Sequence, residues 1–226
     1  MINFQNISKI YLDQIIALKE VTFRIEPEEF VCIVGRSGAG KTTLLKLLLA
    51  IEKPTQGKIF FEGVDISKIK EDKIFNLRRE IGVIFQDYKL IPSKTVYENI
   101  SYVMELTEKL DCNLSKEIPQ ILEIVELEDK ADKFPYQLSG GEQQRVAIAR
   151  AIAHRPKVIL ADEPTGNLDP YHTQDIIKLL KRIHSLGNTV VLATHDKDVI
   201  DSLKERVITL EDGKVIRDEK KGRFIL

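Results

Sequence analysis

Hydrophobic and polar positions alternate with a period of two in the segment LKEVTFRI. Such alternation is typical of half-buried strands, and a short run that is apolar throughout, such as FVCIVG, is typical of a fully buried one. The pattern predicts strands over residues 2–7, 18–25, 30–35 and 57–63. A helical pattern runs from about Lys41 to Ala50, and Pro54 and Gly57 end it.

Helical periodicity replaces the strand pattern between about Asp87 and Pro156. Apolar residues recur at three- and four-residue spacing in TVYENISYVMELTEKL, SKEIPQILEIVELEDKAD and LSGGEQQRVAIAR. A short helix, DKIFNLRRE, and a strand, IGVIFQ, come before this part, and the strand KVILADE follows it. We therefore predict an α-helical subdomain, residues 87–156, inserted into an α/β core of residues 1–86 and 157–226.

Strands and helices alternate again in the last seventy residues. The pattern predicts a helix from about Pro170 to Leu186, the strand NTVVLATH, a short helix after Asp196 and the strand pair RVITLEDGKVIR. An Asp-Gly pair between two alternating runs is a hairpin signal, which places a turn at Asp212 and Gly213. For the final DEKKGRFIL we favour a frayed tail over a contact segment.

Composition narrows the class of protein. The 226 residues are 43% hydrophobic and 31% charged, with a formal net charge of -1, so nothing in the charge favours binding to nucleic acid or to an anionic membrane. We find no signal-peptide pattern and no apolar run long enough to span a bilayer, so we expect a cytoplasmic protein whose membrane role would need a partner. Cys32 and Cys112 lack metal or redox spacing, and Cys32 is expected to be a small buried hydrophobe.

The segment GRSGAGKT matches G-x-x-x-x-G-K-[ST] between a buried strand and a helix, which is the context that a P-loop requires. In such a loop the amides cradle the β-phosphate of a nucleotide, Lys41 bridges the β- and γ-phosphates, and the Thr42 hydroxyl binds Mg²⁺. We predict that ATP with Mg²⁺ contacts Gly35, Arg36, Ser37, Gly38, Ala39, Gly40, Lys41, Thr42 and Thr43, the last at the α-phosphate.

Polar residues end three predicted core strands, at the edge where ligands bind in an open parallel sheet. Asp162 and Glu163 follow the apolar run VILA. Asp162 suits a place near Mg²⁺, and Glu163 suits the general base that orients and deprotonates an attacking water. Gln86 ends IGVIFQ and is expected at Mg²⁺ or at the water. His195 ends VVLATH, where a γ-phosphate contact is expected.

Two further residues have a structural and a functional interpretation. Asp169, in GNLD, follows Glu163 closely and is either part of the nucleotide site or the N-cap of the next helix. Tyr11 lies before the strand LKEVTF and either stacks on adenine or packs in the core.

The helix of LSGGEQQR begins with two glycines, the poorest of the ordinary helix formers. Ser139 and Glu142 form a capping box, but this does not explain Gly140 and Gly141. Bare glycines at a helix N-terminus admit an anion, so we predict a second phosphate site on these four residues. Because the P-loop already binds one nucleotide's phosphates, we expect a head-to-tail homodimer in which Ser139 and Gly141 close over the γ-phosphate held by the other subunit.

Taken together and in this order, these motifs make the chain similar to the nucleotide-binding subunits of ATP-binding cassette (ABC) transporters, over essentially its whole length. The resemblance implies an α/β P-loop NTPase core with a parallel sheet, an N-terminal antiparallel β subdomain and an inserted helical subdomain. It also implies that ATP is hydrolysed in the head-to-tail homodimer, with Glu163 as the base and His195 at the γ-phosphate. The region after Gln86 would dock an integral membrane partner.

Within this family, LADEPTGNLD and LSGGEQQRVAIARAI resemble the group that contains FtsE, LolD and MacB, and IGVIFQDYKLIPSKTVYENI is closest to its cell-division branch. That branch implies an FtsX-like permease-type partner and control of cell-wall hydrolases. Lipoprotein release or export of the LolD or MacB type is the alternative. A DNA-repair ATPase is disfavoured because the helical insertion is too compact for heptad arms, and a scaffold without hydrolysis is disfavoured by Glu163.

Overall fold

The computed structural model of the protein describes residues 1–12, 14–107 and 113–222. The chain divides into two compact units, which are described separately below. The first, here called the terminal unit, contains Met1–Arg78 and Gly187–Leu226. The second, the central unit, contains Arg79–Leu186.

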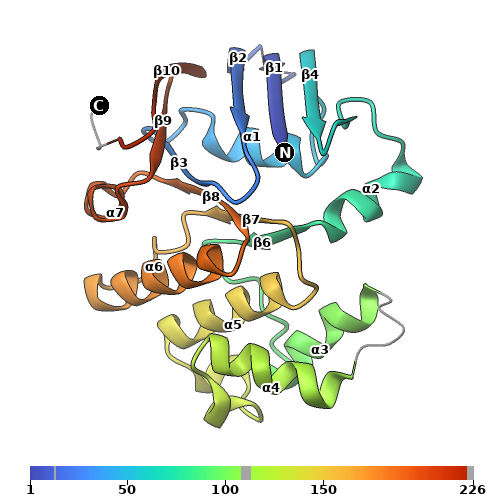
Figure 1. Ribbon diagram of the computed structural model, residues 1–226, viewed down its shortest axis with the longest axis vertical. Coiled ribbons are helices and arrows are strands. Elements are labelled where there is room, and N and C mark those ends of the chain that lie inside the picture. The colour runs from blue at the N-terminus through green and yellow to red at the C-terminus, as the bar shows by residue number, and fades with distance from the viewer. Residues whose placement is uncertain (13, 108–112, 223–226) are drawn as a thin grey trace. The chain divides into compact units, whose positions relative to one another are not determined.

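An antiparallel sheet forms the first part of the terminal unit (Figure 1). Its strand order is β2-β1-β4-β5, with β1 at Ile2–Ile10, β2 at Ile16–Ile25, β4 at Gln56–Phe61 and β5 at Val64–Asp65. One face is apolar and closed to solvent, as Phe4, Ile7 and Ile59 show. The predicted strands of this part are confirmed, and the two-residue β5 is an addition that no alternating pattern signals.

The second sheet of the terminal unit has the strand order β10-β9-β3-β8. It consists of β3 at Phe30–Val34, β8 at Thr189–Thr194, β9 at Arg206–Glu211 and β10 at Lys214–Glu219. The strand β3 is buried along its length and runs parallel to both β8 and β9. Its described residues also form the helices α1 at Lys41–Leu48, α2 at Glu71–Arg79, which ends at the unit boundary, and α7 at Lys197–Leu203.

The hairpin between β9 and β10 turns at Asp212 and Gly213, as predicted. Both residues have positive φ, 47° and 74°, which is the type I′ geometry that matches the twist of paired strands. The prediction of a frayed tail from Asp218 onward is wrong for its first two residues, because Asp218 and Glu219 pair with β9. Residues 223–226 of that predicted tail lie outside the described part of the chain.

The described residues of the central unit form two parallel strands and four helices. The strands are β6 at Ile81–Ile84 and β7 at Val158–Asp162. The helices are α3 at Val96–Leu106, α4 at Leu114–Ile124, α5 at Gly140–Ile152 and α6 at Pro170–Ser185, with short 3₁₀ turns at Glu128–Lys130 and Pro135–Gln137. Helix α5 packs against α6 on one side and against α3 and α4 on the other (Figure 1).

One predicted helix of the central unit is shorter than its pattern indicates. The expected helix over residues 115–132 ends at Ile124, because Glu126 has the left-handed φ of 57° and the Leu127 amide donates back to the Leu122 carbonyl. This is the Schellman arrangement that closes helix C-termini. Residues 108–110, the end of another expected helix, and Cys112 lie outside the described residues. The boundary of the helical subdomain at 87–156 stays a prediction.

Candidate functional site

The P-loop Gly35–Thr42 connects the buried β3 to the first turn of α1. Gly40 is the N-cap residue of α1 and has φ of 104°, a conformation that costs a residue with a side chain much more than glycine. A Cβ at this position would lie 2.5 Å from the Ala17 carbonyl oxygen. The first turn of α1 contains no acidic residue. The free amides and the partial positive charge at this helix N-terminus would favour an anion, and the predicted phosphate contacts stay a prediction.

The side chain of Lys41 folds back onto this loop. Its side chain is nearly buried, and its Nζ donates to the carbonyl oxygens of Gly35 at 2.7 Å and of Arg36 at 3.3 Å. Neutral carbonyls are weaker partners for an ammonium group than phosphate oxygens, so a bound triphosphate gains a charge-assisted contact here. Ser37, Gly38 and Thr42 are exposed around it, Ala39 is buried and Thr43 is half-buried.

Strand register brings His195 next to the P-loop. Val34, the last residue of β3, pairs with Thr194, the last residue of β8, in a parallel ladder. Gly35 and His195 therefore leave neighbouring strands at the same level of the same edge, and His195 is exposed there.

Tyr11 is half-buried after β1 and is not part of the apolar core. Its hydroxyl lies 3.4 Å from the Thr43 Oγ1, so the ring is joined to the helix that begins at the P-loop. The Lys9 Nζ stands over the Tyr11 ring at 5.0 Å from its centroid. Of the two interpretations of Tyr11, packing in the core is wrong, and contact with adenine stays a prediction.

In the central unit, β7 ends at Asp162 and the next residue, Glu163, has a left-handed φ of 49°. A residue other than glycine adopts this conformation at a cost of about 1 kcal/mol, and such strain gathers at functional positions. Both carboxylates are half-buried.

Gln86 follows β6, whose Ile84 pairs with Ala161 of β7, so the register brings Gln86 to the edge where Asp162 ends its strand. The Asn167 Nδ2 donates to the Gln86 carbonyl oxygen at 3.0 Å, and the Gln86 Nε2 lies 3.5 Å from the Asn167 Oδ1. A Cβ on Gly166 would lie 2.7 Å from the Gln86 Nε2. Gln86 therefore rests on the loop that follows Glu163.

Asp169 is the N-cap of α6. Its Oδ1 accepts from the amides of Tyr171 at 2.9 Å and His172 at 3.1 Å, and its Oδ2 pairs with the His172 Nδ1. The hydrogen bond from the His172 side chain, with the capping amides, lowers the pKa of Asp169. The N-cap interpretation is confirmed, and a part of Asp169 in the nucleotide site stays a prediction.

The capping box at the start of α5 is confirmed. The Glu142 amide donates to the Ser139 Oγ at 3.3 Å, and the Ser139 amide donates to the Glu142 Oε2 at 2.8 Å. The Ser139 amide also lowers the pKa of Glu142. Gly141 is buried, and a Cβ on it would lie 2.5 Å from the His172 Cδ2. Packing within the unit therefore explains why position 141 is a glycine, which the sequence did not reveal. A Cβ on the half-buried Gly140 would meet the Tyr88 hydroxyl at 3.1 Å and the end of the Leu168 side chain at 3.6 Å.

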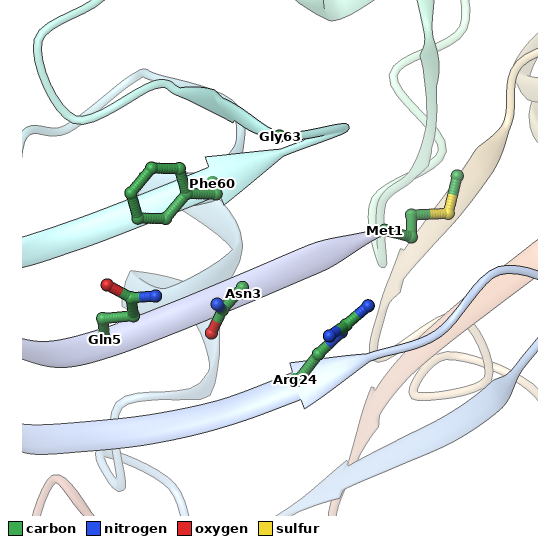
Figure 2. Close-up of a pocket in the computed structure, with 6 residues that line it drawn as sticks. All are labelled: Met1, Asn3, Gln5, Arg24, Phe60 and Gly63. Carbon is green, nitrogen blue, oxygen red and sulfur yellow. The ribbon is translucent and has the colours of Figure 1, made fainter.

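The predicted residues therefore fall into two groups. The terminal unit carries Tyr11, the P-loop with Thr43, and His195. The central unit carries Gln86, Asp162, Glu163, Asp169 and the four residues that begin α5. Among the described residues, no three His, Cys, Asp or Glu side chains are grouped to hold a metal ion. A hollow on the antiparallel sheet, lined by Met1, Asn3, Gln5, Arg24, Phe60 and Gly63, contains none of the predicted residues (Figure 2).

Residues 18–166 match the ABC transporter family. The chain belongs to this family. It is 46% identical over 224 residues to the cell division ATP-binding protein FtsE of Bacillus subtilis, covering 99% of this chain and 98% of that protein. The FtsE of Escherichia coli K12 is 46% identical over 213 residues, covering 94% of this chain and 96% of that protein.

Solved ABC proteins share the fold. A dimeric ATP-binding cassette in a post-hydrolysis state, bound to ADP and Pi, has a TM-score of 0.88 and 39% identity, covering 99% of this chain and 100% of that one. A subunit of the cbiONQ ABC transporter complex of Clostridium perfringens has a TM-score of 0.90 and 33% identity, covering 97% of this chain and 88% of that one. The predicted ABC ATPase fold is confirmed, and the chain is an ABC-type ATPase of the kind that FtsE represents.

No helix within the described part of this ABC protein is long and apolar enough to cross a membrane. Three residues beside the predicted site were missed by the sequence reasoning: Lys9, Asn167 and His172. His172 follows Asp169 by three residues, a spacing at which two side chains of one helical turn can meet, and Lys9 precedes Tyr11 by two residues. Asn167 has no comparable signal, because its contact with Gln86 spans 81 residues.

Proposed function

We propose that this chain binds ATP with Mg²⁺, hydrolyses it in a head-to-tail homodimer and drives an integral membrane protein on the cytoplasmic face of the membrane. The observation that carries the proposal is the presence of two helix N-termini built for an anion. One is the start of α1 behind Gly40, in the terminal unit. The other is the start of α5 at Ser139, in the central unit.

The binding step uses the P-loop. The amides from Gly38 to Thr42 surround the β-phosphate, and Lys41 moves its donors from the loop carbonyls to the β- and γ-phosphate oxygens. Thr43 is placed for the α-phosphate, and Tyr11, joined to Thr43, is placed for the base. Each of these contacts acts on ATP as well as on the transition state, so the P-loop residues and Tyr11 contribute to nucleotide affinity rather than to the rate of the chemical step.

The hydrolysis step uses carboxylate and amide groups at strand ends. Glu163 orients the attacking water and accepts its proton, while Gln86 and His195 position the water and the γ-phosphate. Mg²⁺ prefers hard oxygen donors, which Thr42, Asp162 and Gln86 supply, and when bound it neutralises phosphate charge. The left-handed φ of Glu163 supports this assignment because such backbone conformations are found more often at functional sites.

The dimer places Ser139, Gly140 and Gly141 of one subunit over the γ-phosphate bound by the other, so that ATP joins the subunits and hydrolysis releases them. The solved cassette that is dimeric and bound to ADP and Pi supports this arrangement by its 39% identity. The Ser139 Oγ, which caps α5, lies at the free amides of the helix N-terminus. A phosphate bound at this position would therefore meet backbone N–H donors.

The partner we propose is an FtsX-like permease-type subunit, which the relatives named as cell division proteins support. Cycling of the ATPase would then move that subunit and so activate cell-wall hydrolases outside the membrane. The region after Gln86 is where we expect it to dock. The second candidate is export or lipoprotein release of the LolD or MacB type; the similarity to a subunit of the cbiONQ transporter complex supports a transporter role in general.

The dimer is tested with Glu163→Gln, which keeps the side-chain shape and removes the base. With Mg²⁺ and ATP this variant should elute as a dimer, and the unmodified chain should return to its starting elution volume as ATP is consumed. Elution of Glu163→Gln as a monomer under saturating ATP would contradict the head-to-tail mechanism.

Ser139→Arg tests whether the start of α5 acts on a nucleotide held elsewhere. We expect loss of hydrolysis, with ATP affinity at the P-loop within about twofold of the unmodified chain, because the P-loop itself is unchanged. Lys41→Ala is the matched control, which should lose affinity. Loss of ATP affinity in Ser139→Arg would mean that this residue acts by folding rather than at the γ-phosphate.

The partner is tested by affinity purification of the chain from detergent-solubilised native membranes, followed by mass spectrometry. One membrane protein with a large extracytoplasmic loop, together with wall hydrolases, supports the FtsX-type partner. Two membrane subunits with lipoprotein cargo would support the LolD type and overturn the first choice. Recovery with nucleic acid and no membrane protein would contradict both.

A further inference from the structure

Lys9 is held in place under the ring of Tyr11. Lys9 lies near the end of β1, and Tyr11 follows the last residue of that strand. The Lys9 side chain is 12% exposed, and its Nζ donates to the Glu52 Oε2 at 2.7 Å and to the Lys53 carbonyl at 2.9 Å. The same Nζ lies 5.0 Å from the centre of the Tyr11 ring.

These contacts fix Tyr11 from two directions. The ammonium group of Lys9 attracts the electron-rich face of the ring, and the hydroxyl of Tyr11 is held at 3.4 Å from the Thr43 Oγ1 on α1. Glu52 and the Lys53 carbonyl keep the ammonium group from turning to solvent. A flexible tyrosine would lose side-chain freedom each time it stacked on a base, whereas a ring already held in one orientation does not.

The Lys9 contact is also suited to a stacking role. A cation on one face draws electron density toward itself and leaves the other face less negative, which reduces the repulsion that an electron-rich aromatic ligand meets when it stacks there. The purine ring of adenine is such a ligand. A lysine whose only task was to pair with Glu52 would not need to stand over an aromatic ring.

We propose that Lys9 is a positioning residue for the base of the bound nucleotide: held by Glu52, it orients and polarises the Tyr11 ring and so raises affinity for ADP and ATP. The inference rests on the proposed function in one respect, the stacking of Tyr11 on the base. It adds Lys9 and Glu52 to the residues on which nucleotide affinity depends, although neither is placed at the phosphates.

The test measures the dissociation constant of Mg-ADP by calorimetry. Lys9→Met keeps the apolar stem and removes the cation, and we expect binding to weaken by roughly three- to tenfold, the range of a partly desolvated cation–π contact. Lys9→Arg should restore most of the affinity because guanidinium groups also stack on aromatic faces. Lys58→Met, at an exposed lysine of the neighbouring strand β4, is the control and should bind as the unmodified chain does.

A double-mutant cycle with Tyr11→Ala distinguishes the role of Lys9 from the stacking role of Tyr11. If Lys9 acts through the ring, Lys9→Met should have no further effect once Tyr11 is alanine. An equal loss in both backgrounds, or unchanged affinity in Lys9→Met alone, would overturn the role of Lys9 while leaving the proposed function intact. Unchanged ADP affinity in Tyr11→Ala would instead contradict the stacking role of Tyr11 itself. Thermal unfolding of each variant, measured alongside, identifies a loss that comes from misfolding.

Discussion

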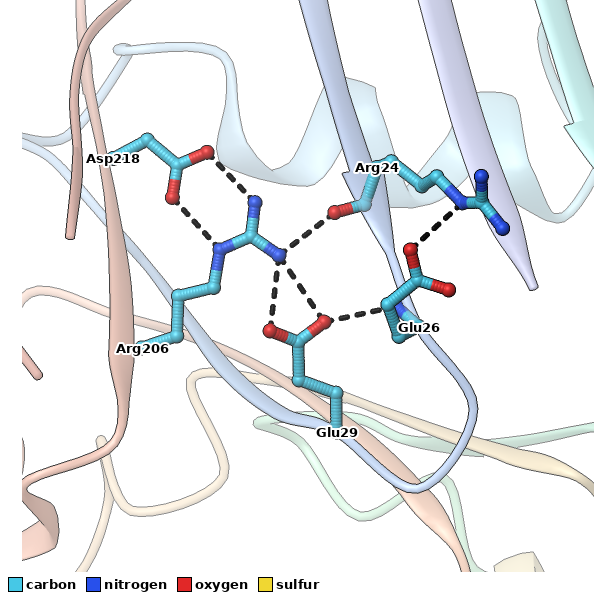
Figure 3. A network of polar contacts seen from close by, with 5 residues as sticks. All are labelled: Arg24, Glu26, Glu29, Arg206 and Asp218. Carbon is cyan, nitrogen blue, oxygen red and sulfur yellow. Dashed lines mark hydrogen bonds and ion pairs between the residues drawn. The ribbon is translucent and has the colours of Figure 1, made fainter. Parts of the chain in front are cut away.

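Arg206 should contribute more to the stability of this protein than any exposed ion pair. Its Nε and Nη2 donate to the two Asp218 oxygens at 2.7 Å each, and its Nη1 donates to both Glu29 oxygens at 3.0 and 3.1 Å and to the Arg24 carbonyl at 2.7 Å (Figure 3). The guanidinium therefore joins β9, β10, the turn before β3 and the end of β2. Hydrogen bonding to Asp218 raises the pKa of Arg206, so the group is charged at every accessible pH.

The size of the effect follows from burial. The side chain of Arg206 is 15% exposed, while those of Glu29 and Asp218 are 25% and 35% exposed. Removing one partner of a fully buried ion pair costs about 3–5 kcal/mol because a charge stays buried without compensation. Here water can reach both carboxylates, so we expect Arg206→Met, which keeps the apolar stem, to lower the free energy of unfolding by about 2–3 kcal/mol. Arg206→Lys should lose about 1–2 kcal/mol, because an ammonium group cannot form the two-pronged contact with Asp218.

Urea unfolding followed by circular dichroism measures this directly. With an m-value of about 2–3 kcal/mol/M, Arg206→Met should lower the midpoint by about 1 M. Arg24→Met is the matched control, because the Arg24 side chain is 61% exposed and pairs with the exposed Glu26, and its carbonyl stays available to Arg206. That variant should change stability by less than about 0.5 kcal/mol. Equal midpoints for Arg206→Met and Arg24→Met would contradict the prediction that Arg206 contributes more to stability than an exposed ion pair.

Three further predictions address the packing and titration of single residues. Gly141→Ala should lower the free energy of unfolding by about 1–3 kcal/mol, because its methyl group would displace the His172 ring. The loss should be smaller in a His172→Ala background, and equal losses in urea titrations of both backgrounds would contradict this packing role. The Ser139 amide lowers the pKa of Glu142, so Glu142 contributes stability that is present above about pH 4.5 and is lost as the pH falls through its folded pKa. The urea midpoint of Glu142→Gln should therefore approach that of the unmodified chain at pH 3, and a constant difference between the two midpoints from pH 6 to pH 3 would contradict this prediction. Burial raises the pKa of Cys32 to about 12, so iodoacetamide at pH 8 should modify Cys32 only after unfolding in urea, as peptide mass spectrometry would detect; rapid modification of the native protein would disprove the burial.

Local pattern was sufficient for most of the secondary structure. The alternation over residues 18–25 and the apolar run over 30–35 depend on which face of a strand meets the core, and both strands formed as predicted. Prediction failed where a few backbone contacts overrode the pattern. The helix after Leu114 stops at Ile124 because a left-handed Glu126 turns the chain, and Asp218 joins β10 because Arg206 holds it. Apolar spacing carries no information about either contact.

The candidate site divides in the same way. A P-loop is a contiguous motif, in which glycine spacing, a lysine and a hydroxyl residue define a phosphate cradle within eight residues. Gly35–Thr42, the capping box at Ser139 and the ABC family could therefore be predicted from the sequence. Three features could not: parallel register sets His195 beside Gly35, the His172 ring requires a glycine at position 141, and Lys9 stands over Tyr11 while pairing with Glu52. The physical reason is separation along the chain. Contacts within one turn of helix or one loop follow from local geometry, whereas contacts across many residues exist only once the sheets and helices have packed.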